Sequence, residues 1–148
     1  MRDKIDYRNL AWFFEGEGTV AYYKRSNGSR KGYLMASVCG TNRKLMEEIY
    51  RQINVKGCLY ISQRAGQYGS KKDAWRVHWA GYNALIVLAG MLPYFNKYSE
   101  KLPQVEFALR VGATSTDDQI ITMKNFKHEK NQSRIETSQN VLDFPEAL

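Results

Sequence analysis

The sequence has few cysteines and histidines, and it contains no long apolar run. Its 148 residues include two cysteines and two histidines, with no CxxC pair and no cluster at zinc-ligand spacing, so neither a disulfide framework nor structural zinc is indicated. Cys39 and Cys58 fit a reducing compartment. The N-terminal residues carry acids where a secretory signal needs an apolar stretch, and no segment has the length that crosses a bilayer. We therefore expect an intracellular protein of the cytoplasm or an organelle matrix, not secreted and without a membrane partner.

Acidic residues are scarce in the middle of the chain. The net charge of the whole sequence is +7. The segment 19–79 holds three acids against twelve basic residues, so its charge is +9 and the remainder sums to −2. This imbalance favours one face that meets phosphates. The length and the 43% hydrophobic content predict a single domain over 1–148, with a core at about 7–131 and a peripheral tail at 132–148.

Hydrophobic periodicity predicts an α+β protomer in the order α-β-β-α-β-β-α. Asp6 can cap a first helix that reaches Glu17, and Gly18 would end it in the left-handed conformation. Runs rich in β-formers predict two hairpins, and Asn42 can cap a helix between them. An apolar helix ended by Pro93 follows, and further helical segments are expected at 102–111 and 117–130. The predicted strands are 19–25, 33–38, 58–64 and 73–79.

The strand residues separate into two sets, as expected for a four-stranded antiparallel sheet with helices on one side. One set is apolar and forms the predicted core face: Val20, Tyr22, Leu34, Ala36, Val38, Leu59, Ile61, Trp75, Val77 and Trp79. The other set is polar, as on any half-exposed sheet, but the basic residues cluster in these strands and their loops. Such a face can enter the DNA major groove and read base edges. The predicted DNA-binding residues are Arg25, Arg30, Lys31, Tyr33, Tyr60, Ser62, Arg64, Lys71, Lys72, Arg76 and His78.

Glu15 and Glu17 lie in the last turn of the first predicted helix, where the helix dipole disfavours negative charge. A hard divalent cation such as Mg²⁺ would offset this, since it prefers carboxylate and carbonyl oxygens. Two copies of the chain meeting at a two-fold axis would bring two such acids together, a geometry that suits metal-assisted phosphoryl transfer. The alternative is a frayed helix end with solvated glutamates.

Residues 10–18, LAWFFEGEG, resemble the signature LAGLIDADG at Leu10, Ala11, Gly16 and Gly18. The resemblance extends from about residue 7 to 112, through VCGTNRKLMEEIYRQI and RVHWAGYNALIVLAGMLPYF. The sequence is thereby similar to the single-motif LAGLIDADG homing endonucleases. That resemblance implies an intron-encoded homodimer whose motif helices pack together beneath two saddle-shaped sheets, over a long, nearly palindromic DNA target.

The resemblance also implies the site residues. Glu17 matches the acid that binds the catalytic Mg²⁺, and the carbonyl of Gly16 is the usual backbone ligand. Such enzymes hydrolyse both DNA strands across the minor groove and leave staggered ends. Glu15 matches a more structural acid, and with Leu10, Ala11 and Phe14 it is expected at the dimer interface, because the apolar side chains need a partner to cover them.

The sequence departs from the family pattern in several places. Trp12 replaces a glycine that lets the paired helices approach closely. Gly40 stands where the family often has Gln or Asn to hold the attacking water, so Thr41 or Asn42 would have to substitute. Tyr98 aligns with the active-site lysine, for which Lys97 and Lys101 are the nearest candidates, and a lysine there could neutralise developing charge on the phosphate.

Other functions fit the same surface. An RNA-binding maturase that assists intron splicing needs the same basic sheet, and a sequence-specific DNA-binding protein could have kept the fold without cutting. Retention of Glu17 argues against the non-cleaving protein. The sequence leaves nuclease and maturase open, and cleavage of a plasmid that carries the exon junction in Mg²⁺ separates them.

Overall fold

The computed structural model describes residues 4–24 and 31–126. The predicted α+β order is confirmed, with one additional short strand after the helix at 102–111. The elements are α1 (Tyr7–Glu17), β1 (Gly18–Lys24), β2 (Gly32–Gly40), α2 (Arg43–Gln52), β3 (Cys58–Gln63), β4 (Ala74–Ala80), α3 (Tyr82–Met91), α4 (Leu102–Val111) and β5 (Thr114–Ser115), with 3₁₀ turns η1 (Gln67–Gly69) and η2 (Leu92–Tyr94). Residues 117–126 are also helical. Arg25, Arg30 and the expected tail at 132–148 lie outside the described residues.

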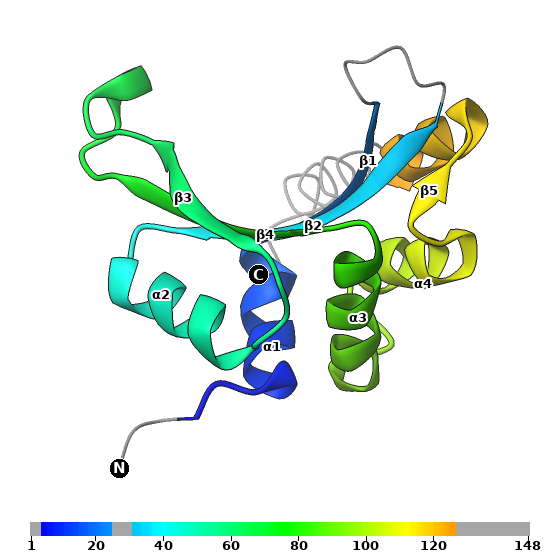
Figure 1. Ribbon diagram of the computed structural model, residues 1–148, viewed down its shortest axis with the longest axis horizontal. Helices are drawn as coiled ribbons and strands as arrows, with labels where there is room; N and C mark the ends of the chain where they lie inside the picture. The colour runs from blue at the N-terminus through cyan, green and yellow to red at the C-terminus, as the bar shows by residue number, and fades with distance from the viewer. Residues whose placement is uncertain (1–3, 25–30, 127–148) are drawn as a thin grey trace, which may run out of the picture.

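The strands form one antiparallel sheet in the order β1-β2-β4-β3, and β5 pairs with β2. Helices α1, α2, α3 and α4 lie on one side of this sheet, while the two hairpins rise on the other side (Figure 1). The sheet is therefore bent, and its concave face points away from the helices. None of the helices in the described part of the chain has the length and hydropathy needed to cross a membrane.

The two faces of the sheet follow the predicted alternation in β1, β2 and β4. Val20, Leu34, Val38, Val77 and Trp79 are buried against the helices, as expected from their parity. The residues of edge strand β3 are only partly buried. Tyr22 reaches across the core from β1 to the end of α4, where its hydroxyl donates to the carbonyl of Gly112 at 2.7 Å. Burial raises the pKa of Tyr22 to about 12.

The first helix begins as predicted but ends differently. Asp6 accepts a hydrogen bond from Asn9 N at 3.1 Å, and the Asn9 side chain accepts one from Asp6 N, so both groups cap α1. The prediction that Gly18 ends α1 in the left-handed conformation is wrong, because Gly18 is extended (φ −89°, ψ 155°) and begins β1. A Cβ at Gly18 would lie 2.3 Å from Cγ of Phe14. Glycine is needed there because the Phe14 ring packs directly on the backbone.

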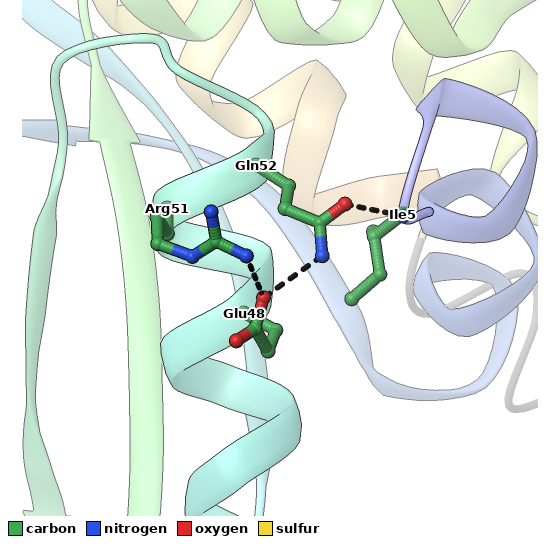
Figure 2. Close-up of polar contacts among 4 residues, drawn as sticks. All are labelled: Ile5, Glu48, Arg51 and Gln52. Atoms are coloured by element: carbon green, nitrogen blue, oxygen red, sulfur yellow. Dashed lines mark hydrogen bonds and ion pairs between the residues drawn. The ribbon is translucent and has the colours of Figure 1, made fainter. Parts of the chain in front are cut away.

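The end of α2 is tied to the chain that enters α1. Gln52 accepts a hydrogen bond from the backbone nitrogen of Ile5 at 2.7 Å and donates to Glu48 at 2.8 Å, as Figure 2 shows. Glu48 also pairs with Arg51 at 2.5 Å. These contacts fix the start of α1 against α2, and so help to set where the motif helix meets the sheet.

Candidate functional site

Glu17 lies at the last position of α1, where the helix meets the sheet, and its side chain is exposed. It lines a surface hollow of about 300 Å³ together with Gly40, Thr41 and Asn42, which come from the turn between β2 and α2. Phe13, Leu45 and Met46 form the apolar floor of this hollow. The structure therefore brings together Glu17 and Asn42, which were predicted for one site from segments far apart in the sequence.

The turn from β2 to α2 constrains what Asn42 can do. Its Oδ1 accepts a hydrogen bond from Leu45 N at 3.1 Å, which caps α2 as predicted. The amide nitrogen is then the group that can donate to a water or a phosphate oxygen. A Cβ at Gly40 would lie 3.3 Å from Met46 Sδ and 3.3 Å from Phe13 Cζ, so a longer side chain would crowd the hollow.

Glu15 is fixed within its own protomer. One carboxylate oxygen accepts a hydrogen bond from the hydroxyl of Ser99, and the other accepts one from Glu100 N at 3.2 Å. These hydrogen bonds within the same chain are consistent with the structural role that the resemblance implies for Glu15. These bonds attach the segment before α4 to the last turn of α1.

Lys101, which directly precedes α4, also contacts the end of α1. The side chain is 9% exposed, and Nζ donates to the carbonyl of Gly18 at 2.6 Å. A cation at the end of α1 favours the helix dipole, and it holds the backbone next to Glu17. The expectation that a lysine here neutralises developing charge on the phosphate stays a prediction for both candidates. Lys101 contacts the backbone at the end of α1, whereas Lys97 is exposed with Nζ 4.9 Å from the centroid of the Tyr98 ring.

The donor set at Glu17 fits Mg²⁺ better than a transition metal. Among the described residues, no three histidine, cysteine, aspartate or glutamate side chains are grouped to hold a metal ion. Mg²⁺ needs no such cage, because it keeps several waters and is often bound by one or two carboxylates together with substrate phosphates. The exposed carboxylate of Glu17 and the carbonyl of Gly16, in a last turn whose carbonyls lack intrahelical donors, are ligands of that kind.

The concave face of the sheet has a polar centre. Arg76 in β4 lies between Cys39 in β2 and Tyr60 in β3, and its guanidinium donates to Ser37 Oγ at 3.5 Å. His78 packs edge-on against Tyr60, with ring centroids 5.3 Å apart. Burial, and then the charge of Arg76, lower the pKa of His78 below its usual 6.5, so the ring is neutral at pH 7. The predicted residues Tyr60, Arg76 and His78 are thus assembled into one cluster.

An irregularity in β3 changes the predicted parity at its end. Ile61 pairs with Trp75, but the next paired residue is Gln63, opposite Ala74, so Ser62 is an extra residue in the strand. Ser62 stays on the concave side, where its hydroxyl lies 3.5 Å from Cys39 Sγ. Because paired residues share a face, Gln63 joins that side as well. The placement of Arg64 on this face as a strand residue is wrong, since β3 ends at Gln63.

The remaining predicted contacts lie toward the two ends of the concave face. Tyr33 packs near Tyr23 at the β1–β2 end, with ring centroids 6.1 Å apart, and Lys31 is exposed just before β2. Lys71 and Lys72 are exposed in the loop between β3 and β4. A Lys24–Asp117 ion pair of 3.0 Å connects β1 to the helix at 117–126. Cationic groups are therefore spread along the sheet rather than gathered at one point.

The expectation that the apolar side chains of α1 need a partner to cover them is wrong for all three residues concerned. Leu10, Ala11 and Phe14 are 0%, 2% and 0% exposed within a single chain, because they pack into the core of their own protomer. Trp12 is instead 77% exposed. It borders a surface hollow of about 390 Å³ that Glu15, Tyr94, Phe95 and Tyr98 also line. The aromatic surface that a partner could cover is therefore centred on Trp12.

Comparison with known proteins identifies the fold. No protein-family model and no curated protein matches the sequence. One similar structure is the crystal structure of the homing endonuclease I-CvuI in complex with the I-CreI target, in the presence of Mg and with the DNA not cleaved. Its TM-score to this chain is 0.54 and its sequence identity is 15%, and the match covers 96% of this chain and 85% of that chain. The LAGLIDADG meganuclease I-AabMI, bound to uncleaved DNA, has a TM-score of 0.51 and 20% identity over 70% of this chain and 34% of that chain. This chain thus spans only part of the length of I-AabMI. The fold is that of LAGLIDADG homing endonucleases.

Proposed function

We propose that this protein is a Mg²⁺-dependent, site-specific DNA endonuclease that makes a staggered double-strand break as a homodimer. The observation that carries the proposal is the position of Glu17. Its exposed carboxylate ends α1 at the point where that helix meets the sheet, beside a hollow that Thr41 and Asn42 also line. Duplex DNA on the polar concave face would pass close to this point. Two proteins that share the fold are bound to DNA, which supports DNA as the partner.

Residues in and around the hollow have different roles in the proposed hydrolysis. Glu17 and the carbonyl of Gly16 would hold Mg²⁺, which supplies activation of water and stabilisation of the departing oxygen when bound. Asn42 orients a water or a phosphate oxygen through its amide nitrogen. Lys101 and Glu15 keep the end of α1 in place through the Gly18 carbonyl and Ser99. Affinity for DNA comes from the cations and tyrosines of the sheet.

Cleavage of a defined plasmid tests the proposed function. The purified protein is incubated in Mg²⁺ with a plasmid that carries the uninterrupted insertion site of its host intron, and in parallel with the same plasmid lacking that site. We expect linear product only from the plasmid with the site and only with Mg²⁺, and binding without cutting when Ca²⁺ replaces it. Enhanced splicing of the intron RNA without any linear plasmid would identify a maturase instead.

The homodimer makes a separate prediction at Trp12. Since Trp12 is largely exposed beside an aromatic hollow, we expect the partner to cover it, and truncation of a buried interface tryptophan typically weakens association by about 2 kcal/mol or more. Trp12→Ala should therefore raise the dimer dissociation constant by about 30-fold or more, measured by sedimentation at several concentrations. Tyr82→Ala, which removes another exposed aromatic residue from α3, is the matched control. Only monomer mass for the wild type, with and without DNA, would contradict a two-fold site.

A further inference from the structure

The loop between β3 and β4 contains one exposed aromatic residue whose backbone conformation is strained. Tyr68 has φ 50° and ψ 31°, in the left-handed region, and its side chain is 99% exposed. This backbone conformation is unfavourable for a residue with a Cβ, and an exposed ring gains no packing that would offset the cost. The position of Tyr68 is therefore imposed by the rest of the loop.

Hydrogen bonds around Gln67 hold the loop in this shape. The carbonyl of Gln67 accepts from Gln63 Nε2 and from Ser70 N, both at 2.9 Å, and its side-chain oxygen accepts from Arg64 N at 2.9 Å. Gly66 N donates to the carbonyl of Ser70 at 2.7 Å. Further along, Asp73 accepts from Ala65 N at 2.7 Å. The backbone that carries Tyr68 is thus held before any partner arrives, which lowers the entropic cost of ordering the loop on binding.

The charge around this ring points to a polyanion. Arg64, Lys71 and Lys72 are exposed in the same loop. The one acid of the loop, Asp73, is engaged with the Ala65 backbone. The loop lies at the end of the sheet farthest from α4 and β5, and it continues the concave side on which the hairpins rise (Figure 1). An exposed ring on a held backbone among three cations is suited to a partner that carries phosphates and apolar sugar edges close together, as duplex DNA does.

We propose that Tyr68 packs against the nucleotide surface of duplex DNA beyond the centre of the bound segment, while Lys71 and Lys72 meet adjacent phosphates. This rests on the proposed function only in requiring DNA on the concave face, and it does not require cutting. The contact reads no base, because a phenol ring packed on the sugar edge of the backbone carries no sequence information. It therefore strengthens binding to target and to unrelated duplexes by the same factor.

Affinity measurements on mixed-sequence duplexes test this role. Tyr68→Ala should weaken binding to a long duplex by about 5- to 10-fold, the order expected when roughly half of one aromatic ring is no longer covered, whereas Tyr68→Phe should remain near wild type. A duplex too short to reach the loop should bind wild type and Tyr68→Ala equally. Tyr82→Ala is the matched control, because that 73% exposed tyrosine lies on α3, on the other side of the sheet, and should change nothing.

Thermal melting of the same variants separates contact from structure. Tyr68→Gly should bind as weakly as Tyr68→Ala and melt at or above the wild-type temperature, because glycine relieves the left-handed conformation. Equal affinities of wild type and Tyr68→Ala for the long duplex overturn the inference. So does a Tyr68→Ala variant that loses affinity only for an RNA hairpin, or one whose weaker binding is accompanied by a lower melting temperature. A wild type that binds duplex DNA without cutting contradicts the proposed nuclease alone, and one that binds no duplex contradicts both.

Discussion

Phe14→Ala is expected to lower the free energy of unfolding by about 3–5 kcal/mol, the usual loss for removing a buried phenylalanine. The ring is 0% exposed, packs edge-on against Phe95 at 6.2 Å between centroids, and covers the backbone at Gly18. Its removal leaves a cavity between α1 and the start of β1, directly behind Glu17. Denaturant unfolding followed by circular dichroism measures the loss.

The dependence of this loss of stability on protein concentration distinguishes a Phe14 in the core of one chain from a Phe14 at the dimer interface. A residue in the protomer core destabilises the protein equally at every protein concentration, whereas an interface residue acts through the dimer equilibrium. Trp12→Ala is the contrasting variant, because its exposed side chain should leave protomer stability within about 0.5 kcal/mol. If Phe14→Ala unfolded like wild type at low concentration and only dimerised more weakly, the side chain would belong to the interface.

The alternation of apolar and polar residues predicts which side chains of the strands are buried, because only one face of the sheet is covered by helices. Val20, Leu34 and Val77 are buried as expected, and Tyr60 and His78 are on the opposite side. The same rule is wrong at the end of β3, since one extra residue, Ser62, puts Gln63 on the concave side as well. No composition signal marks this irregularity, as serine and glutamine suit either face of an edge strand.

The candidate site could be predicted in part. The acid at the end of α1 is visible in the sequence because it opposes the helix dipole and falls in the motif, and the structure places Asn42 beside the same hollow. The partners of Lys101 and Glu15 could not be inferred, because they join segments separated by 83 and 84 residues. Burial of Leu10 and Phe14 within the protomer also depends on tertiary packing, since a helix face that needs cover does not specify which chain provides it.

Glu17→Gln is expected to reduce DNA cleavage by several orders of magnitude while leaving folding and DNA affinity nearly unchanged. The amide keeps the size of the side chain but loses the charge that Mg²⁺ requires. Glu17 is exposed, so the melting temperature of the metal-free protein should correspond to a stability change within about 0.5 kcal/mol. Binding in Ca²⁺ should persist, because the sheet supplies the cations that meet the phosphates.

Glu15→Gln is the matched control for Glu17→Gln, since it makes the same change of charge two positions earlier on α1. Glu15 accepts hydrogen bonds from Ser99 and Glu100, so its substitution should lower the melting temperature, with cleavage per folded molecule falling by no more than about tenfold. Cleavage, affinity and melting are measured on the same preparations. Near wild-type cutting by Glu17→Gln would show that Glu17 is not the metal ligand. A Glu17→Gln protein that melts early or no longer binds DNA would instead assign this residue the structural role that the contacts give to Glu15.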